Sequence, residues 1–122
     1  MTYRVTTVWQ KNTDADVSAA VSAEGFRKDF LEQGLSSAQF VDWVGTRNLV
    51  GWDSVKDDIK RCFEIFTESF NETEQTYTQI VDWDNKDLYD GFRAYIQQIL
   101  DDPDTIPDID YCSKVSVNEE EI

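Results

Sequence analysis

One stretch decides the fold of this chain: residues 60–83, KRCFEIFTESFNETEQTYTQIVDW. A helix and a strand compete for its first part. The helical interpretation rests on apolar side chains at helical spacing, which would form one stripe: Ile59, Phe63, Phe66 and Phe70. The strand interpretation rests on β-prone residues at every second position: Phe63, Ile65 and Thr67. We favour a strand that begins near Arg61, because the polar run 70–74 would then form the turn of a hairpin.

The helical alternative has one further argument, which is an echo in the sequence. Trp52-Asp53-Ser54 resembles Trp83-Asp84-Asn85, the pattern of a strand end followed by a helix cap. Ser54 would then cap a short helix, even if a strand begins near Arg61. The two interpretations therefore differ over residues 61–70, which form the first strand of a hairpin in the preferred interpretation and a helix in the alternative.

The second half of the stretch, residues 76–83, alternates clearly and predicts a strand. Tyr77, Val81 and Trp83 would share one face, and Asp82 would point to the other. Directly after it, Asp84 or Asn85 would cap a helix over residues 86–100. The buried stripe of that helix would comprise Leu88, Phe92, Tyr95, Ile96 and Ile99.

The N-terminal part predicts a strand and then a helix. Residues 3–10 place four side chains on one face: Tyr3, Val5, Thr7 and Trp9. Ser22 is a candidate N-cap for a helix that carries Phe26, Phe30 and Leu31, and Gly34 would end it. Residues 35–58 fit neither period well, and we expect a short helix or turn followed by an extended piece.

The C-terminal part predicts a loop, a last strand and an acidic end. Pro103 and Pro107 would stop the preceding helix and keep the chain extended. Residues 111–117 predict a strand, whose polar surroundings indicate the edge of a sheet. We expect one domain over residues 1–118, with the acidic residues 119–122 as a solvated, frayed end.

The order strand, helix, strand, strand, helix, strand resembles the ferredoxin-like fold and, within it, the dimeric α+β barrel superfamily. The resemblance is carried by the hairpin that runs into residues 80–85 (IVDWDN) and by the helix with Tyr89, Phe92 and Arg93. It implies an α+β fold, with an antiparallel sheet covered by helices on one face. It also implies a homodimer with Trp and Tyr side chains on the facing sheets. The superfamily includes monooxygenases of antibiotic biosynthesis, but the histidines that some members use are absent here.

The formal charge of −14, from 25 acidic and 11 basic residues, limits the partners. Residues 101–122 hold eight acidic side chains against Lys114 alone, which is half of the net charge. Because this charge repels phosphate, we expect no direct binding of nucleic acid, whereas a basic protein partner is compatible with it. No run of about 20 apolar residues and no apolar leader segment is present, so we expect a cytoplasmic protein outside the membrane.

The residue types restrict the chemistry. The lack of histidine excludes Ser-His-Asp triads and histidine-based zinc hydrolysis, and the scattered glycines form no phosphate-binding loop. Cys62 and Cys112 are far apart in the sequence, and we expect two reduced, partly buried thiols. Asp82 and Asp84, like the adjacent acids at 57 and 58, could form carboxylate pairs. Strand alternation and helix capping explain the first two, so we expect no catalytic residue, metal or cofactor.

Four residues are candidates for a ligand pocket or a dimer interface: Trp9, Tyr77, Val81 and Trp83. The leading hypothesis is a non-catalytic, homodimeric ferredoxin-like protein with a role in assembly or in binding a protein or a small apolar ligand. One alternative is a cofactor-independent, monooxygenase-like enzyme that holds an aromatic substrate among the tryptophans. The other is an acidic inhibitor that mimics nucleic acid and occupies the site of a basic enzyme.

Overall fold

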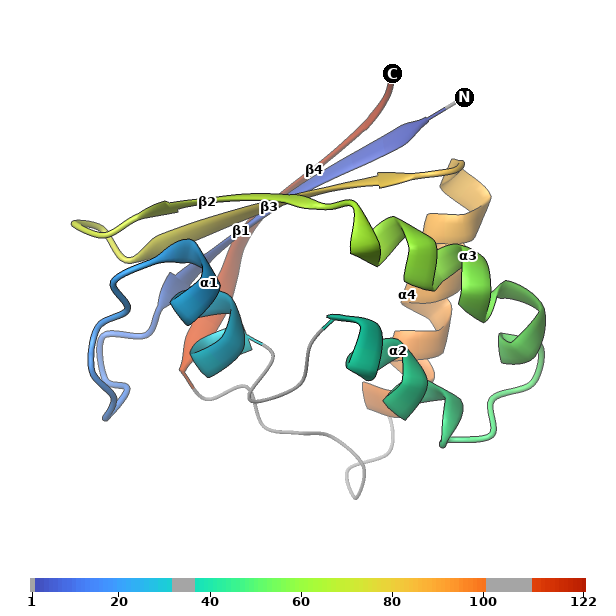
Figure 1. The fold of residues 1–122 in the computed structure, drawn as a ribbon, viewed down its shortest axis with the longest axis horizontal. Coiled ribbons are helices and arrows are strands. Elements are labelled where there is room, and N and C mark those ends of the chain that lie inside the picture. Colours follow the sequence, from blue (N-terminus) through green and yellow to red (C-terminus); the bar gives the residue numbers. More distant parts are fainter. Residues whose placement is uncertain (1, 32–36, 101–110) are drawn as a thin grey trace.

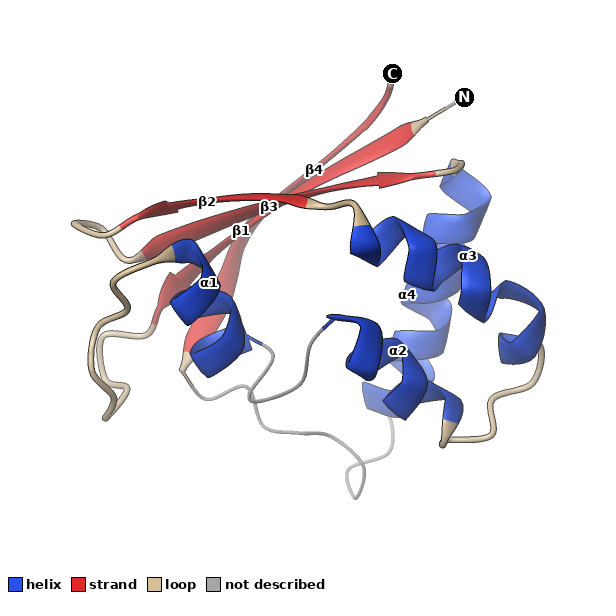
Figure 2. Ribbon diagram, in the orientation of Figure 1, coloured by secondary structure: helices blue, strands red, loops and turns tan. Residues whose placement is uncertain are grey.

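The computed structural model describes residues 2–31, 37–100 and 111–122. Over these residues the chain has an α+β fold, in which one antiparallel sheet of four strands is covered by helices on one face (Figure 1). The strands lie in the order β2-β3-β1-β4. Figure 2 shows the two layers, with the sheet on one side and the helices on the other. In chain order, the elements are β1 Tyr3–Lys11, α1 Ala23–Phe26, the π-helical turn η1 Arg27–Leu31, α2 Ser37–Gly45, α3 Trp52–Glu64, β2 Thr67–Asn71, β3 Thr76–Trp83, α4 Lys86–Leu100 and β4 Cys112–Glu121.

The two central strands, β1 and β3, pair in the register that their alternation predicts. Val5 lies opposite Val81, and Thr7 lies opposite Gln79. Side chains at these positions are buried under the helices, whereas their sequence neighbours are only half-buried on the open face. The predicted strands over residues 3–10 and 76–83, helix α4 and the shared face of Tyr77, Val81 and Trp83 are confirmed.

The preferred interpretation of residues 61–66 is wrong. Helix α3 continues to Glu64, and β2 begins only at Thr67, so the helical alternative holds for the first part of this segment. The reason is tertiary, because the helix buries Ile59 and Cys62 almost completely. The hairpin itself is confirmed, and Asn71 accepts a hydrogen bond from the Glu74 backbone in its turn (3.1 Å).

The expectation of an extended piece before residue 58 is also wrong. Two helices, α2 and α3, fold this region and pack on one another. Gly51 begins α3 in the left-handed conformation (φ 85°), which glycine adopts without steric cost. Ser54 lies inside the first turn of α3 and donates to the Gly51 carbonyl oxygen (2.7 Å), instead of capping the helix from outside.

The other predicted caps have mixed outcomes. The Ser22 hydroxyl accepts from the Gly25 backbone amide (3.0 Å), which confirms it as the N-cap of α1. Asn85 accepts from the Leu88 backbone amide (2.8 Å) and so caps α4. The predictions for Gly34, Pro103 and Pro107 fall outside the described residues.

Strand β4 lies at the edge of the sheet, as its polar sequence predicts. It differs from the expectation at its end, because it runs on to Glu121 instead of fraying after residue 118. Glu121 lies opposite Tyr3, and the Ile122 amide donates to the Thr2 carbonyl oxygen (2.9 Å). Backbone pairing with β1 thus holds the acidic end in place, although its side chains are exposed.

The helices divide the covered face of the sheet into two apolar cores (Figure 1). At one end, Phe26 and Phe30 of α1 and η1 pack on Tyr77. At the other, Trp52 and Ile59 of α3 pack near the sheet in the cluster that contains Trp83, Val5 and Val81. Each fully buried side chain of this size contributes about 1.5–3 kcal/mol to folding. The middle of the sheet lies between the two cores.

Candidate functional site

A cavity of about 320 Å³ lies over the middle of the sheet, on the side that the helices cover. Its floor is formed by alternate residues of β1 and β3: Val5, Thr7, Trp9, Gln79, Val81 and Trp83. Its wall is formed by one face of α4: Tyr89, Phe92, Arg93, Ile96 and Gln97. Phe63 of α3 and Lys114 of β4 complete the described lining. The volume is at the lower end of the range for small-molecule sites, which is roughly 300–1,000 Å³.

Two polar residues interrupt the apolar floor. Thr7 and Gln79 lie opposite each other on neighbouring strands, and both are buried. The next pair along the same face of these strands is apolar, with Val5 of β1 opposite Val81 of β3. Both side chains can donate and accept hydrogen bonds, so Thr7 and Gln79 supply the polar groups of an otherwise apolar floor.

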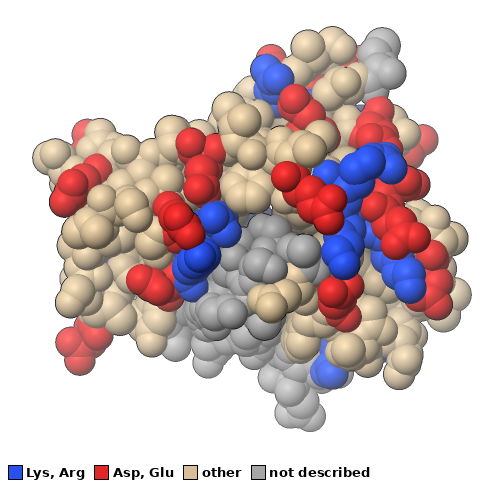
Figure 3. Space-filling view, viewed as in Figure 1, with Lys and Arg blue, Asp and Glu red and all other residues tan. Residues whose placement is uncertain are grey.

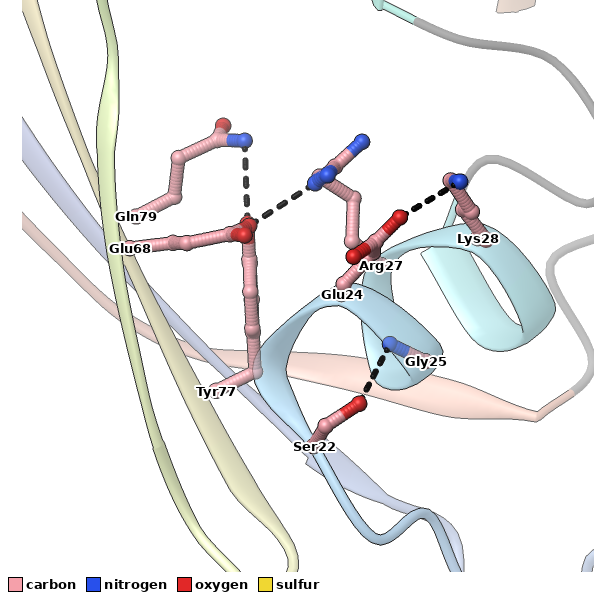
Figure 4. Close-up of polar contacts among 8 residues, drawn as sticks. All are labelled: Ser22, Glu24, Gly25, Arg27, Lys28, Glu68, Tyr77 and Gln79. Carbon is pink, nitrogen blue, oxygen red and sulfur yellow. Dashed lines mark hydrogen bonds and ion pairs between the residues drawn. The ribbon is translucent and has the colours of Figure 1, made fainter.

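The Gln79 side chain is one end of a chain of hydrogen bonds that continues through Tyr77 and Glu68 (Figure 4). Its amide donates to the Tyr77 hydroxyl (3.3 Å), and that hydroxyl donates to the Glu68 carboxylate (2.7 Å). The Arg27 Nε also donates to Glu68 (2.7 Å), and its guanidinium lies over the Phe66 ring. Burial, and then the hydrogen bond to Glu68, raise the pKa of Tyr77 well above its ordinary value. The network therefore joins η1 to the sheet and orients the Gln79 amide at the edge of the cavity.

Packed aromatic rings form the apolar part of the cavity wall. The Trp83 ring lies 5.2 Å from that of Phe92 and 5.6 Å from that of Phe63. Phe63 and Phe92 also meet edge to face at 5.3 Å. Rings held on three elements in this way present a preorganised surface for a flat apolar molecule.

The cavity lining also includes two cations, which come from different elements. Arg93 projects from α4, and its guanidinium lies 5.7 Å from the centre of the Tyr89 ring. Lys114 projects from β4, where it pairs with Trp9. Lys114 retains access to solvent, yet loss of water around its ammonium group lowers its pKa, and the charge of Arg93 lowers it further.

Three of the four candidate site residues, Trp9, Val81 and Trp83, line the cavity. Tyr77 lies in the other core, with its ring stacked on Phe26 at 5.3 Å. Trp9 packs on that core as well, and its ring lies 5.8 Å from that of Tyr77. All four are on the covered face of the sheet, so none of them lies on the open face where a facing sheet would pack.

The polar residues of the cavity are not singled out by the sequence patterns considered above. Gln79 had no distinguishing pattern, since polar residues also alternate along the open face of β3. Lys114 had a signal, because it is the only basic residue among the eight acidic ones of residues 101–122. Phe92 belongs to the buried stripe of α4, and Arg93 is the next residue in the helix. Arg93 therefore lies at the border of the apolar face.

Three of the carboxylates considered from the sequence, those of Asp82, Asp84 and Asp58, belong to surface ion pairs. Asp82 accepts two hydrogen bonds from Arg4 on the open face (2.8 and 3.0 Å), and this contact lowers its pKa. Asp84 and Asp58 both contact Arg61. In the described parts of the chain, no group of three or more His, Cys, Asp or Glu side chains could hold a metal ion.

Both cysteines are free and buried, and burial raises the pKa of each thiol, that of Cys112 to about 11. They are therefore protonated and unreactive near neutral pH. Among the helices that the structure describes, none is long and apolar enough to cross a membrane.

Comparisons with protein-family models, with curated proteins and with solved structures gave no match.

Proposed function

We propose that this protein is a small-molecule binding protein and that the cavity between the sheet and α4 is its binding site. The observation that carries the proposal is a cavity of about 320 Å³ with aromatic walls and two buried polar residues in an apolar floor. This combination of apolar surface and a few placed polar groups is typical of ligand sites. The ligand would lie against Trp83 and Phe92 and contact Thr7 and Gln79.

The described lining supports binding more than catalysis. Burial raises the pKa of Tyr89, so this hydroxyl is a poor base near neutral pH. Gln79 and Thr7 can donate and accept hydrogen bonds but do not titrate in this range. The monooxygenase-like alternative shares the same cavity, and turnover of a bound aromatic compound would favour it over simple binding.

The ferredoxin-like topology and the homodimer are further parts of this proposal. The strand order β2-β3-β1-β4, in which β3 lies between β1 and β2, supports the topology. The connection from β1 to β2 carries α1, η1, α2 and α3, where the simple pattern has one helix. For the dimer, the open face of the sheet offers Val8 and Ile80 among threonines. The molar mass in solution, measured by light scattering, tests it, and a monomer at all concentrations would exclude it.

The nucleic-acid mimic is the less favoured alternative, because acidic side chains are interleaved with basic ones. Figure 3 shows red and blue side chains next to one another on the face viewed. Several of them form ion pairs, including Lys60 with Asp42 and Lys28 with Glu24. A mimic of nucleic acid would instead present an unbroken row of negative charge.

Two matched tryptophan variants test the proposed site. Thr7→Trp would place an indole in the cavity, whereas Thr6→Trp adds the same group on the open face of the same strand. A panel of small aromatic compounds, neutral, anionic and cationic, is titrated into ¹⁵N-labelled protein.

We expect saturable shifts of the Thr7 and Gln79 amide signals in the wild type and in Thr6→Trp, and loss of the Gln79 shift in Thr7→Trp. Ile96→Trp, which fills the cavity from the α4 wall, repeats the test if Thr7→Trp does not fold. The proposal fails if no compound shifts these signals, or if the folded cavity-filling variant binds as well as Thr6→Trp.

A further inference from the structure

An irregularity in β4 turns Lys114 toward the cavity. From Tyr3 to Val8 the β1–β4 register is regular, and Val8 lies opposite Ser116. The register then shifts, so that Trp9 lies opposite Lys114 and Val115 has no partner. In a regular ladder Val115 would face Trp9 and Lys114 would point to the open side. The bulge exchanges the two, leaves Val115 53% exposed and adds Lys114 to the cavity lining.

The charge of the cavity is opposite to that of the protein. The chain has a formal charge of −14, yet the described lining contains Arg93 and Lys114 and no acidic side chain. The nearest ion-pair partner of Arg93 in the described chain is Glu119, at 4.0 Å, and Lys114 forms no ion pair with a described residue. Both side chains are exposed, that of Arg93 to 62%, so the two cations lie where the cavity opens to solvent. Their charges repel each other, and an anion bound at this opening would relieve the repulsion.

Resting on the proposed function, we infer that the ligand of the cavity is a small aromatic molecule with one negative charge, such as an aromatic carboxylate. Its anionic group would lie between Arg93 and Lys114, and its ring would lie on Trp83 and Phe92. Thr7 and Gln79 would supply neutral hydrogen bonds from the floor. The volume of about 320 Å³ limits the ligand to one or two fused rings.

The test compares three probes with the same apolar body and different charge. 2-Naphthoate, 2-naphthamide and 2-naphthylmethylammonium carry one negative, no and one positive charge. Affinities are measured by calorimetry and by shifts of the Thr7 and Gln79 amide signals. The salt concentration is kept near 0.15 M, where the screening length of about 8 Å reduces repulsion from the distant acidic surface.

We expect 2-naphthoate to bind at least tenfold more tightly than 2-naphthamide, a difference of about 1.4 kcal/mol, and the cation to bind most weakly. Lys114→Gln and Arg93→Gln should each weaken 2-naphthoate binding severalfold and change 2-naphthamide binding less than twofold. The control Lys86→Gln removes the same charge from the start of α4, outside the cavity, and should change neither.

The outcomes separate the inference from the proposed function. If 2-naphthamide or the ammonium probe binds in the cavity as tightly as 2-naphthoate, the cavity is a binding site but the anionic ligand is wrong. The inference also fails if the preference for 2-naphthoate survives in both Lys114→Gln and Arg93→Gln. If none of the three probes shifts the cavity signals, the proposed function and the inference are overturned together.

Discussion

Replacing Tyr77 by phenylalanine tests the network that connects the two halves of the covered face. The Tyr77 ring is fully buried, and its hydroxyl donates to Glu68 at 2.7 Å and accepts from Gln79 at 3.3 Å. Tyr77→Phe keeps the ring, including its stacking on Phe26, and removes only the oxygen. Glu68 keeps its contact with Arg27, so the carboxylate is not left without a partner.

The expected cost follows from the kind of bond that is lost. A hydrogen bond to a charged group contributes about 1.5–3 kcal/mol, so we expect the free energy of unfolding to fall by about 2 kcal/mol. For a domain of this size that corresponds to a decrease in Tm of roughly 8 °C. Urea denaturation followed by circular dichroism measures the first quantity, and calorimetry measures the second.

Tyr89→Phe is the matched control, because Tyr89 is also buried but its hydroxyl forms no hydrogen bond with a described residue. We expect it to change stability by less than about 0.5 kcal/mol. Equal effects of Tyr77→Phe and Tyr89→Phe would refute the assignment of the loss to the Glu68 network.

The same variant has a predicted signature at alkaline pH. In the folded protein the pKa of Tyr77 is raised above its ordinary value of 10.0, so folding favours the protonated form. The stability that this proton linkage contributes is complete below pH 10 and is lost as the pH rises above it. Tyr77→Phe should therefore lose less stability than the wild type between neutral pH and pH 11. A parallel decline in both proteins would show that Tyr77 does not contribute to it.

Three further predictions concern other parts of the fold. Gly51→Ala should destabilise the protein by about 1–2 kcal/mol, because the φ angle of residue 51 is 85° and the added Cβ would lie 2.7 Å from the Tyr95 hydroxyl oxygen. Adding Tyr95→Phe to this variant should recover part of the lost stability, measured by urea denaturation. Asp82→Asn should reduce the loss of stability below pH 4. Arg4 lowers the pKa of Asp82, so the ionised carboxylate stabilises the folded protein, and this stabilisation disappears as the carboxylate is protonated. An unchanged acid unfolding curve would contradict the prediction. Both thiols should react with a disulfide reagent far more slowly in the native protein than in urea, since burial keeps them protonated.

Elements with strong local periodicity were predictable from the sequence. Strand β3 and helix α4 have the predicted bounds, because eight alternating residues followed by Asn85 and an apolar stripe leave few alternatives. Three of the four candidate site residues, Trp9, Val81 and Trp83, also line the cavity. Alternation places them on the buried face, and the cavity lies on that face.

Residues 61–66 could not be assigned in this way, since their apolar side chains satisfy both periods. Burial of Ile59 and Cys62 against the rest of the protein decides for the helix. The acidic end, residues 119–121, lacks apolar side chains, and it is ordered by backbone pairing with β1. Such pairing depends on a strand more than one hundred residues away in the chain and leaves no local pattern.

Local periodicity and composition are sufficient to predict the α+β class, the buried face of the central strands and the distribution of charge, because these depend on residues a few positions apart. Three other features follow from tertiary contacts: the end of α3, the two cores with a cavity between them, and the direction of Lys114 toward this cavity. Each of these depends on which distant segment packs or pairs at that point, and the bulge at Val115 shows how one unpaired residue reverses the direction of a side chain.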